Sequence, residues 1–295
     1  MELIIENLNK TYRNGVHALQ NLHLEIQSGM FGLLGPNGAG KSSLMRTIAT
    51  LQEPDSGSIH FKGQNIFDQP MELRKVLGYL PQSFGVYPGI SAERLLDYLA
   101  TLKGLHDKKT RKRAIREVLE LTNLYDVRKR HASTYSGGMK QRFGIAQLLL
   151  NQPQLIIVDE PTAGLDPSER KRFLNLLLEI SHRNIVLFST HIVDDVRDLC
   201  QDMAIMNHGQ ILLRDTPTQS LDRLKGKVWH IDLPRRDLEA FQAQYAVLSF
   251  QFRTAETVQV RVYADQQPHS GFQSVEVDLE DVYFHTLQTA QLPIV

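Results

Sequence analysis

A glycine-rich stretch, GPNGAGKSS at residues 35–43, constrains the fold of this chain more than any other feature. It fits the pattern G-x-x-x-x-G-K-[ST], follows an apolar segment at residues 30–34 and precedes a helical pattern that begins at Lys41. Glycines let a backbone wrap around phosphate groups, and the N-terminus of a helix favours an anion. The sequence therefore predicts a strand, a phosphate-binding loop and a helix in that order, which is the start of an α/β fold.

The loop residues have predicted roles toward a nucleotide and a Mg²⁺ ion. Lys41 places a positive charge on the β and γ phosphates, and Ser42 offers its hydroxyl to the metal. The predicted nucleotide contacts of the loop are Gly35, Pro36, Asn37, Gly38, Ala39, Gly40, Lys41, Ser42 and Ser43.

Strand and helix patterns alternate along most of the chain. Strands are expected at residues 3–8, 22–26, 155–158, 185–189 and 203–206, and helices at residues 167–180 and 192–199. Apolar strands separated by helices indicate a parallel sheet with helices on both faces. Residues 91–122 have helical patterns interrupted at Gly104, which predicts a helical insertion at about residues 84–150. After residue 224 the pattern changes to short strands and helices, so we expect a small α+β domain at residues 225–295.

Residues 155–161, LIIVDEP, combine a buried strand with two carboxylates at its C-terminal end. An open α/β sheet binds its ligand at that end of its strands. Asp159 is predicted to hold Mg²⁺, and Glu160 to orient or deprotonate an attacking water. The pattern alone is also typical of a strand that ends in solvent, but its place after the phosphate-binding loop favours the catalytic interpretation.

A second anion-binding pattern, TYSGGMKQR at residues 134–142, follows the helical insertion. Ser136, Gly137 and Gly138 stand where a helix is expected to begin, and the first N–H groups of a helix have no partner within it. One chain therefore contains two predicted phosphate loops.

The charge balance and the single cysteine exclude several classes of protein. Thirty-three basic side chains match thirty-three acidic ones, so the positive field typical of nucleic-acid binding is absent. The basic run KKTRKR at residues 108–113 is interpreted as a solvated helix face, with a nucleic-acid or lipid-headgroup contact as the alternative. Cys200 has no partner for an internal disulfide. Because no apolar run approaches the ~20 residues of a membrane span, we expect a soluble chain without a signal peptide.

With these motifs in this order, residues 1–224 resemble the ATP-binding cassette (ABC) proteins, the ATPase subunits of ABC transporters. The resemblance implies a P-loop NTPase cassette with a mixed sheet and a helical insertion, and ATP and Mg²⁺ as ligands. It implies further site residues. These are Tyr12 stacked on adenine, Gln82 as a catalytic and metal-binding residue, Ser136, Gly137 and Gly138 as the signature, residues 163–166 with Asp166 as the D-loop, and His191 at the γ-phosphate.

The signature differs from the family's usual LSGGQ at two positions. Tyr135 replaces leucine and Met139 replaces glutamine, so a polar contact at residue 139 is lost, while the serine and both glycines remain. Methionine followed by KQR resembles a prokaryotic exporter branch whose ATPases are separate from their membrane subunits.

The resemblance implies a dimer, a homodimer or a paired cassette subunit, in which each ATP lies between the P-loop of one cassette and the signature of the other. Lys41, Glu160, Gln82 and His191 are then the catalytic residues of a water attack on the γ-phosphate. A separate transmembrane permease is expected to dock along residues 82–102, where Ile90, Leu95, Leu96 and Leu99 line a cleft or belong to the core. The chain is expected to be cytoplasmic, peripheral on the inner face of the cell membrane, without direct nucleic-acid contact.

Two other functions stay open at this point. One is a soluble ABC ATPase that acts on ribosomes or nucleic acid, although such proteins carry two cassettes in one chain. The other is an assembly ATPase for iron–sulfur clusters. The C-terminal domain also resembles tails of the exporter branch, with packing or dimer support favoured over a regulatory ligand site.

Overall fold

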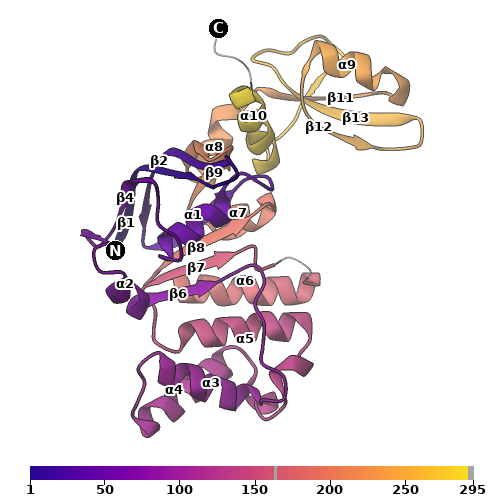
Figure 1. The fold of residues 1–295 in the computed structure, drawn as a ribbon. Coiled ribbons are helices and arrows are strands. Elements are labelled where there is room, and N and C mark those ends of the chain that lie inside the picture. The colour runs from indigo at the N-terminus through magenta and orange to yellow at the C-terminus, as the bar shows by residue number, and fades with distance from the viewer. Residues whose placement is uncertain (163–164, 292–295) are drawn as a thin grey trace.

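The structure is a computed structural model that describes residues 1–162 and 165–291. Figure 1 shows a central sheet with helices beneath it and a second, smaller domain above it. The expected α/β class with a helical insertion is confirmed.

The central sheet has six strands in the order β10-β9-β3-β8-β7-β6. All neighbouring pairs are parallel except β9 and β10, which form a hairpin. Its strands are β3 (Gly29–Leu34), β6 (Leu77–Leu80), β7 (Leu155–Asp159), β8 (Ile185–Thr190), β9 (Asp202–Asn207) and β10 (Gln210–Asp215). Strands β7 and β8 are buried along their whole length because helices or strands cover both faces. Parallel pairing brings the C-terminal ends of β3, β6, β7 and β8 to one edge, where the predicted site residues follow.

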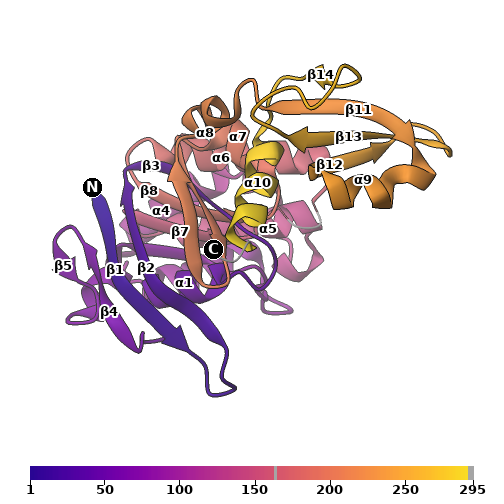
Figure 2. The same cartoon turned by 90° about the horizontal axis from the view of Figure 1, so that it is seen from above.

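An antiparallel sheet in the order β2-β1-β4-β5 covers one face of the central sheet. Figure 2 shows its long β1–β2 hairpin at the edge of the molecule. Its strands are β1 (Glu2–Thr11), β2 (His17–Gln27), β4 (Ser56–Phe61) and β5 (Gln64–Asn65). Helix α1 (Lys41–Ile48) packs between the two sheets, with Leu44, Met45 and Ile48 fully buried in the cluster they share.

The helical insertion has a core of its own. It contains α3 (Ala92–Leu102), α4 (Lys108–Leu121), α5 (Gly137–Leu149) and the short turns η1 (Tyr125–Val127) and η2 (Ala132–Thr134). Leu96, Leu119 and Phe143, one from each long helix, are fully buried in that core. Helix α2 (Pro70–Val76) precedes β6, and α6 (Pro167–Ser181) and α7 (Val193–Leu199) cover the other face of the central sheet.

The C-terminal region follows α8 (Pro217–Leu224) and forms an antiparallel sheet in the order β12-β13-β11-β14. Its elements are β11 (Val228–Pro234), η3 (Arg235–Asp237), α9 (Leu238–Gln244), β12 (Ala246–Phe252), β13 (Thr257–Tyr263), β14 (Gln273–Ser274) and α10 (Leu279–Gln291). The last helix, α10, also packs against the first domain. Leu279, Val282 and Tyr283 of α10 belong to the core cluster that includes α6 and α7, so the end of the chain returns to the first domain.

Candidate active site

The phosphate-binding loop connects β3 to α1, as the sequence predicts. Gly40 has a φ of 106°, and a Cβ there would lie 2.4 Å from the carbonyl oxygen of Ala18, so only glycine fits. Lys41 is only 4% exposed, and its Nζ donates to the carbonyl oxygens of Gly35 at 2.7 Å and Pro36 at 3.2 Å. The loop therefore holds its lysine inside the curve that would receive phosphates.

Glu160 joins three of the predicted catalytic residues. Its Oε1 lies 3.3 Å from Lys41 Nζ, and its Oε2 accepts a hydrogen bond from Gln82 Nε2 at 3.3 Å and lies 3.2 Å from His191 Nδ1. The four side chains come from α1 and from the segments that follow β6, β7 and β8, so the parallel sheet brings them together. Glu160 is 9% exposed, and this low exposure strengthens its interaction with the lysine.

Ser189 contacts both acidic residues at the end of β7, through the carboxylate of Asp159 and the backbone N–H of Glu160, and the sequence analysis did not assign it a role. Its Oγ donates to Asp159 Oδ1 at 2.6 Å and accepts from the backbone N–H of Glu160 at 3.0 Å. Glu160 has a φ of 44°, which is unusual for a residue with a side chain and is typical of functional sites. Because Ser189 is directly opposite Asp159 in the β7–β8 register, only the paired strands reveal this link.

The predicted metal ligands suit Mg²⁺ by their chemistry. Ser42, Gln82 and Asp159 offer a hydroxyl, an amide and a carboxylate oxygen, and Mg²⁺ binds oxygen ligands and keeps waters or phosphates in its shell. Gln82 turns its Nε2 to Glu160, which leaves its amide oxygen for another contact. Within the described part of the chain, no group of three His, Cys, Asp or Glu residues could hold a metal by itself. Waters or phosphate oxygens would complete the shell.

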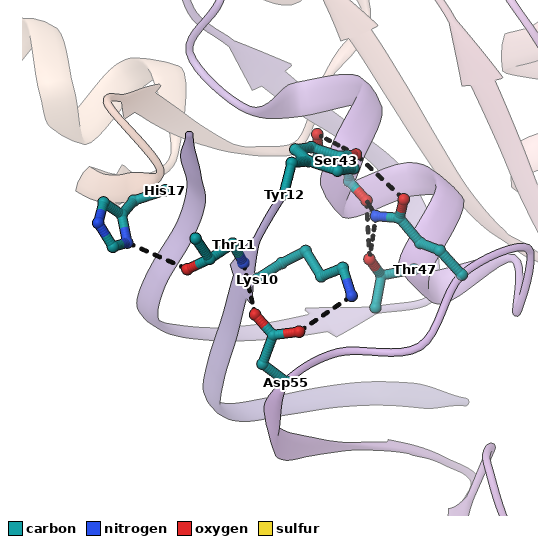
Figure 3. Close-up of polar contacts among 8 residues, drawn as sticks. Lys10, Thr11, Tyr12, His17, Ser43, Thr47 and Asp55 are labelled. Atoms are coloured by element: carbon teal, nitrogen blue, oxygen red, sulfur yellow. Dashed lines mark hydrogen bonds and ion pairs between the residues drawn. The ribbon is translucent and has the colours of Figure 1, made fainter. Parts of the chain in front are cut away.

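Tyr12 lies beside the start of α1 (Figure 3). Its hydroxyl is 3.0 Å from Ser43 Oγ and donates to Gln52 Oε1 at 3.0 Å. The strand end before it is anchored by Asp55, which accepts from the N–H of Thr11, and this bond holds the pKa of Asp55 below its usual value. These contacts keep Tyr12 next to the phosphate-binding loop, while its stacking on adenine stays a prediction.

The signature serine and first glycine lie on the surface, and none of the described hydrogen bonds or ion pairs joins them to the Glu160 cluster. Ser136 caps α5, with its Oγ accepting from the N–H of Met139 at 3.3 Å, and both Ser136 and Gly137 are exposed. Gly138 is buried against the side chain of Glu169, where an added Cβ would meet Oε2 at 2.5 Å. The structure thus separates the two predicted phosphate loops.

The unusual signature residues pack into the helical insertion. Tyr135 is buried, its ring meets Phe143 edge-on with centroids 6.0 Å apart, and its hydroxyl donates to the carbonyl oxygen of Val127 at 3.0 Å. Met139 is half-buried against the same core. Both side chains therefore belong to the core of the helical insertion.

The D-loop is only partly visible, because Ala163 and Gly164 lie outside the described residues. Asp166 caps α6, and its Oδ1 accepts from the N–H of Glu169 at 2.9 Å. Its predicted nucleotide contact stays a prediction.

A cleft of about 300 Å³ separates the central sheet from the helical insertion. It is lined by the following residues: Ala49, Leu51, Arg74, Leu77, Tyr79, Leu80, Pro81, Phe84, Gly85, Leu99, Lys103, Gly144, Gln147 and Leu148. Of the four apolar residues considered for it, Leu95 and Leu96 are instead core residues, because they lie on the face of α3 that packs on α4 and α5. Leu99 lines the cleft, and Ile90 is 37% exposed outside it.

Across residues 1–162 and 165–291, no helix combines the length and apolar character that crossing a membrane requires.

Comparisons with known proteins identify the family of this chain. A model of the ABC transporter family matches residues 19–163. The chain is 38% identical over 210 residues to the uncharacterized ABC transporter ATP-binding protein YxlF of Bacillus subtilis, covering 71% of this chain and 69% of the relative. It is 34% identical over 223 residues to the linearmycin resistance ATP-binding protein LnrL of the same organism, covering 75% and 71%.

A solved dimeric structure of an ATP-binding cassette in a post-hydrolysis state, bound to ADP and Pi, is also similar. It matches with a TM-score of 0.66 and 25% identity, over 72% of this chain and 98% of that one. The fold and these similarities show that the chain belongs to the ABC transporter family, as an ATP-binding subunit that hydrolyses ATP.

Proposed function

We propose that two copies of this chain, or this chain and a paired cassette, enclose two ATP molecules and drive a separate transmembrane subunit that exports its cargo. The observation that carries the proposal is the separation of two half-sites. The Glu160 cluster is assembled within one chain, while Ser136 and Gly137 are exposed elsewhere on its surface. A second cassette that brings its own signature would complete the site.

Within the cluster, each side chain has a role in the attack of water on the γ-phosphate. Lys41 leaves the carbonyl oxygens and carboxylate that it now contacts and moves its charge to the phosphates. Glu160, released from that ion pair, orients the water and accepts its proton. His191 and the signature N–H groups stabilise the charge that develops on the phosphate.

Ser42, Gln82 and Asp159 would hold Mg²⁺ beside the phosphates, where the ion neutralises part of their charge. Gln82 has a second role, since it lies between the Glu160 carboxylate and the segment that leads into the helical insertion. A change at the γ-phosphate can therefore pass through Gln82 to the cleft.

The cleft between the central sheet and the helical insertion is the proposed docking site for the transmembrane subunit. Exposed apolar side chains are found on the elements around it: Leu51, Met71, Tyr87, Tyr98 and Leu102.

The name of LnrL refers to resistance to linearmycin, which supports export as the direction of transport. The chain would then be held peripherally on the cytoplasmic face of the membrane.

The proposal is tested with Glu160→Gln, which keeps the size of the side chain and removes its charge. We expect ATP turnover to fall ~10²-fold or more, because the group that accepts the proton is lost. ATP binding should persist, and the variant with Mg-ATP should run as a dimer in size-exclusion chromatography with light scattering. A variant that turns over ATP normally, or that stays monomeric with saturating Mg-ATP, would contradict the proposal.

A further inference from the structure

Asp195 is a buried carboxylate close to the active site that the predicted catalytic set does not include. It lies on α7, four residues after His191, and is 2% exposed. Its Oδ2 accepts a hydrogen bond from Thr162 Oγ1 at 3.2 Å, and its Oδ1 accepts from Nε and Nη2 of Arg170 at 2.8 and 2.6 Å. Both carboxylate oxygens are thus engaged by residues of two other segments.

These contacts connect three parts of the chain that border the γ-phosphate site. Thr162 follows Glu160 by two residues, and Arg170 lies one turn into α6, whose cap is Asp166. Asp195 itself belongs to the helix that begins just after His191. One carboxylate therefore joins the segments that carry the proposed base, the D-loop residue and the phosphate-binding histidine.

The burial of this carboxylate is unfavourable by itself. Desolvation raises the pKa of Asp195, while the hydrogen bonds and charge of Arg170 and the hydroxyl of Thr162 oppose that shift. Apolar side chains of similar volume often stabilise a core as well as a buried ion pair does. The benefit of an aspartate at this position is then its directed hydrogen bonds, which fix the relative positions of the three segments.

We propose that Asp195 is a positioning residue for ATP hydrolysis, which holds Glu160, His191 and the start of α6 in the arrangement that the chemical step requires. The inference rests on the proposed roles of Glu160 and His191. Asp195 lies beyond direct contact with the reacting atoms and acts through Thr162 and Arg170. Small displacements of catalytic groups are known to cost large factors in rate.

The test compares Asp195→Asn with Asp194→Asn, a matched control on the same helix. Asp194 is an exposed aspartate that pairs with Arg197 on the surface. We expect Asp195→Asn to lower kcat about tenfold while the KM for ATP changes less than about twofold, because positioning acts on the transition state and not on substrate binding. Asp194→Asn should keep both values.

Thr162→Val provides a milder variant, in case Asp195→Asn does not fold. It removes one hydrogen bond to Asp195 and should lower kcat by roughly threefold with a melting temperature close to that of the parent. If the variants that fold keep the parent's kcat, whatever their melting temperature, Asp195 has a purely structural role and the inference is wrong. Glu160→Gln is assayed beside them. Full activity of Glu160→Gln would instead overturn the proposed function.

Discussion

The two helix N-termini that are predicted to bind phosphate, those of α1 and α5, are built differently. At α1, Lys41 is buried, and its ammonium group contacts Glu160, which also contacts Gln82 and His191. At α5, the hydroxyl of Ser136 bonds only to its own helix among the described contacts, and it faces the surface.

This difference supports the proposal that the two helix ends belong to two different composite sites. The α1 site has a carboxylate, Glu160, in contact with both a lysine and a histidine, so the proposed nucleotide-binding groups are assembled within one chain. The α5 site offers exposed N–H groups and a hydroxyl, and the charges beside it, Glu169 and Arg142, pair with each other, which suits a donor that completes a site on another molecule. The proposed head-to-tail arrangement would use both helix ends in one site.

The largest expected difference is in nucleotide binding by the isolated chain. Lys41→Ala should weaken the binding of Mg-ATP about tenfold to a hundredfold, because a charge-assisted contact to phosphate is worth ~1.5 to 3 kcal/mol. Ser136→Arg should change it less than twofold, since a single chain does not use its signature for its own nucleotide. Titration calorimetry at low protein concentration measures both. Equal losses in the two variants would mean that Ser136 belongs to the same site as Lys41.

A smaller effect, on the free energy of unfolding, is expected for Tyr135, the residue before the signature serine. Tyr135→Phe removes the hydrogen bond to the carbonyl oxygen of Val127 and should lower the free energy of unfolding by about 1 kcal/mol. Tyr98→Phe, at an exposed site on α3 in the same helical insertion, should change it by less than about 0.5 kcal/mol. Urea unfolding of both variants gives the comparison. Equal stability of the two would show that the Tyr135 hydroxyl does not hold the signature loop.

Local motifs allowed much of the α1 site to be predicted from the sequence. The glycine spacing before Lys41 and the pair Asp159 and Glu160 after an apolar strand are defined by neighbours in the chain. Their common position follows from the rule that parallel strands end at one edge. The meeting of Gln82 and His191 at Glu160 agrees with that reasoning.

Contacts between distant side chains could not be predicted in this way. Ser189 and Asp195 look ordinary in the sequence, and only the register of β7 with β8 and the packing of α6 on α7 give them partners. The spacing of Leu279 and Val282 in the sequence does not identify what these residues pack against. The structure places them on the first domain, in the cluster that includes α6 and α7.

Mixing two weakened variants tests the central claim most directly. In a mixed dimer, the Ser136→Arg chain supplies an intact phosphate-binding loop and the Lys41→Ala chain supplies an intact signature, so one of the two sites is whole. The account predicts that the mixture hydrolyses ATP faster than the sum of the two variants measured alone. A rate equal to that sum, at protein concentrations where the parent chain is active, would show that each chain completes its own site.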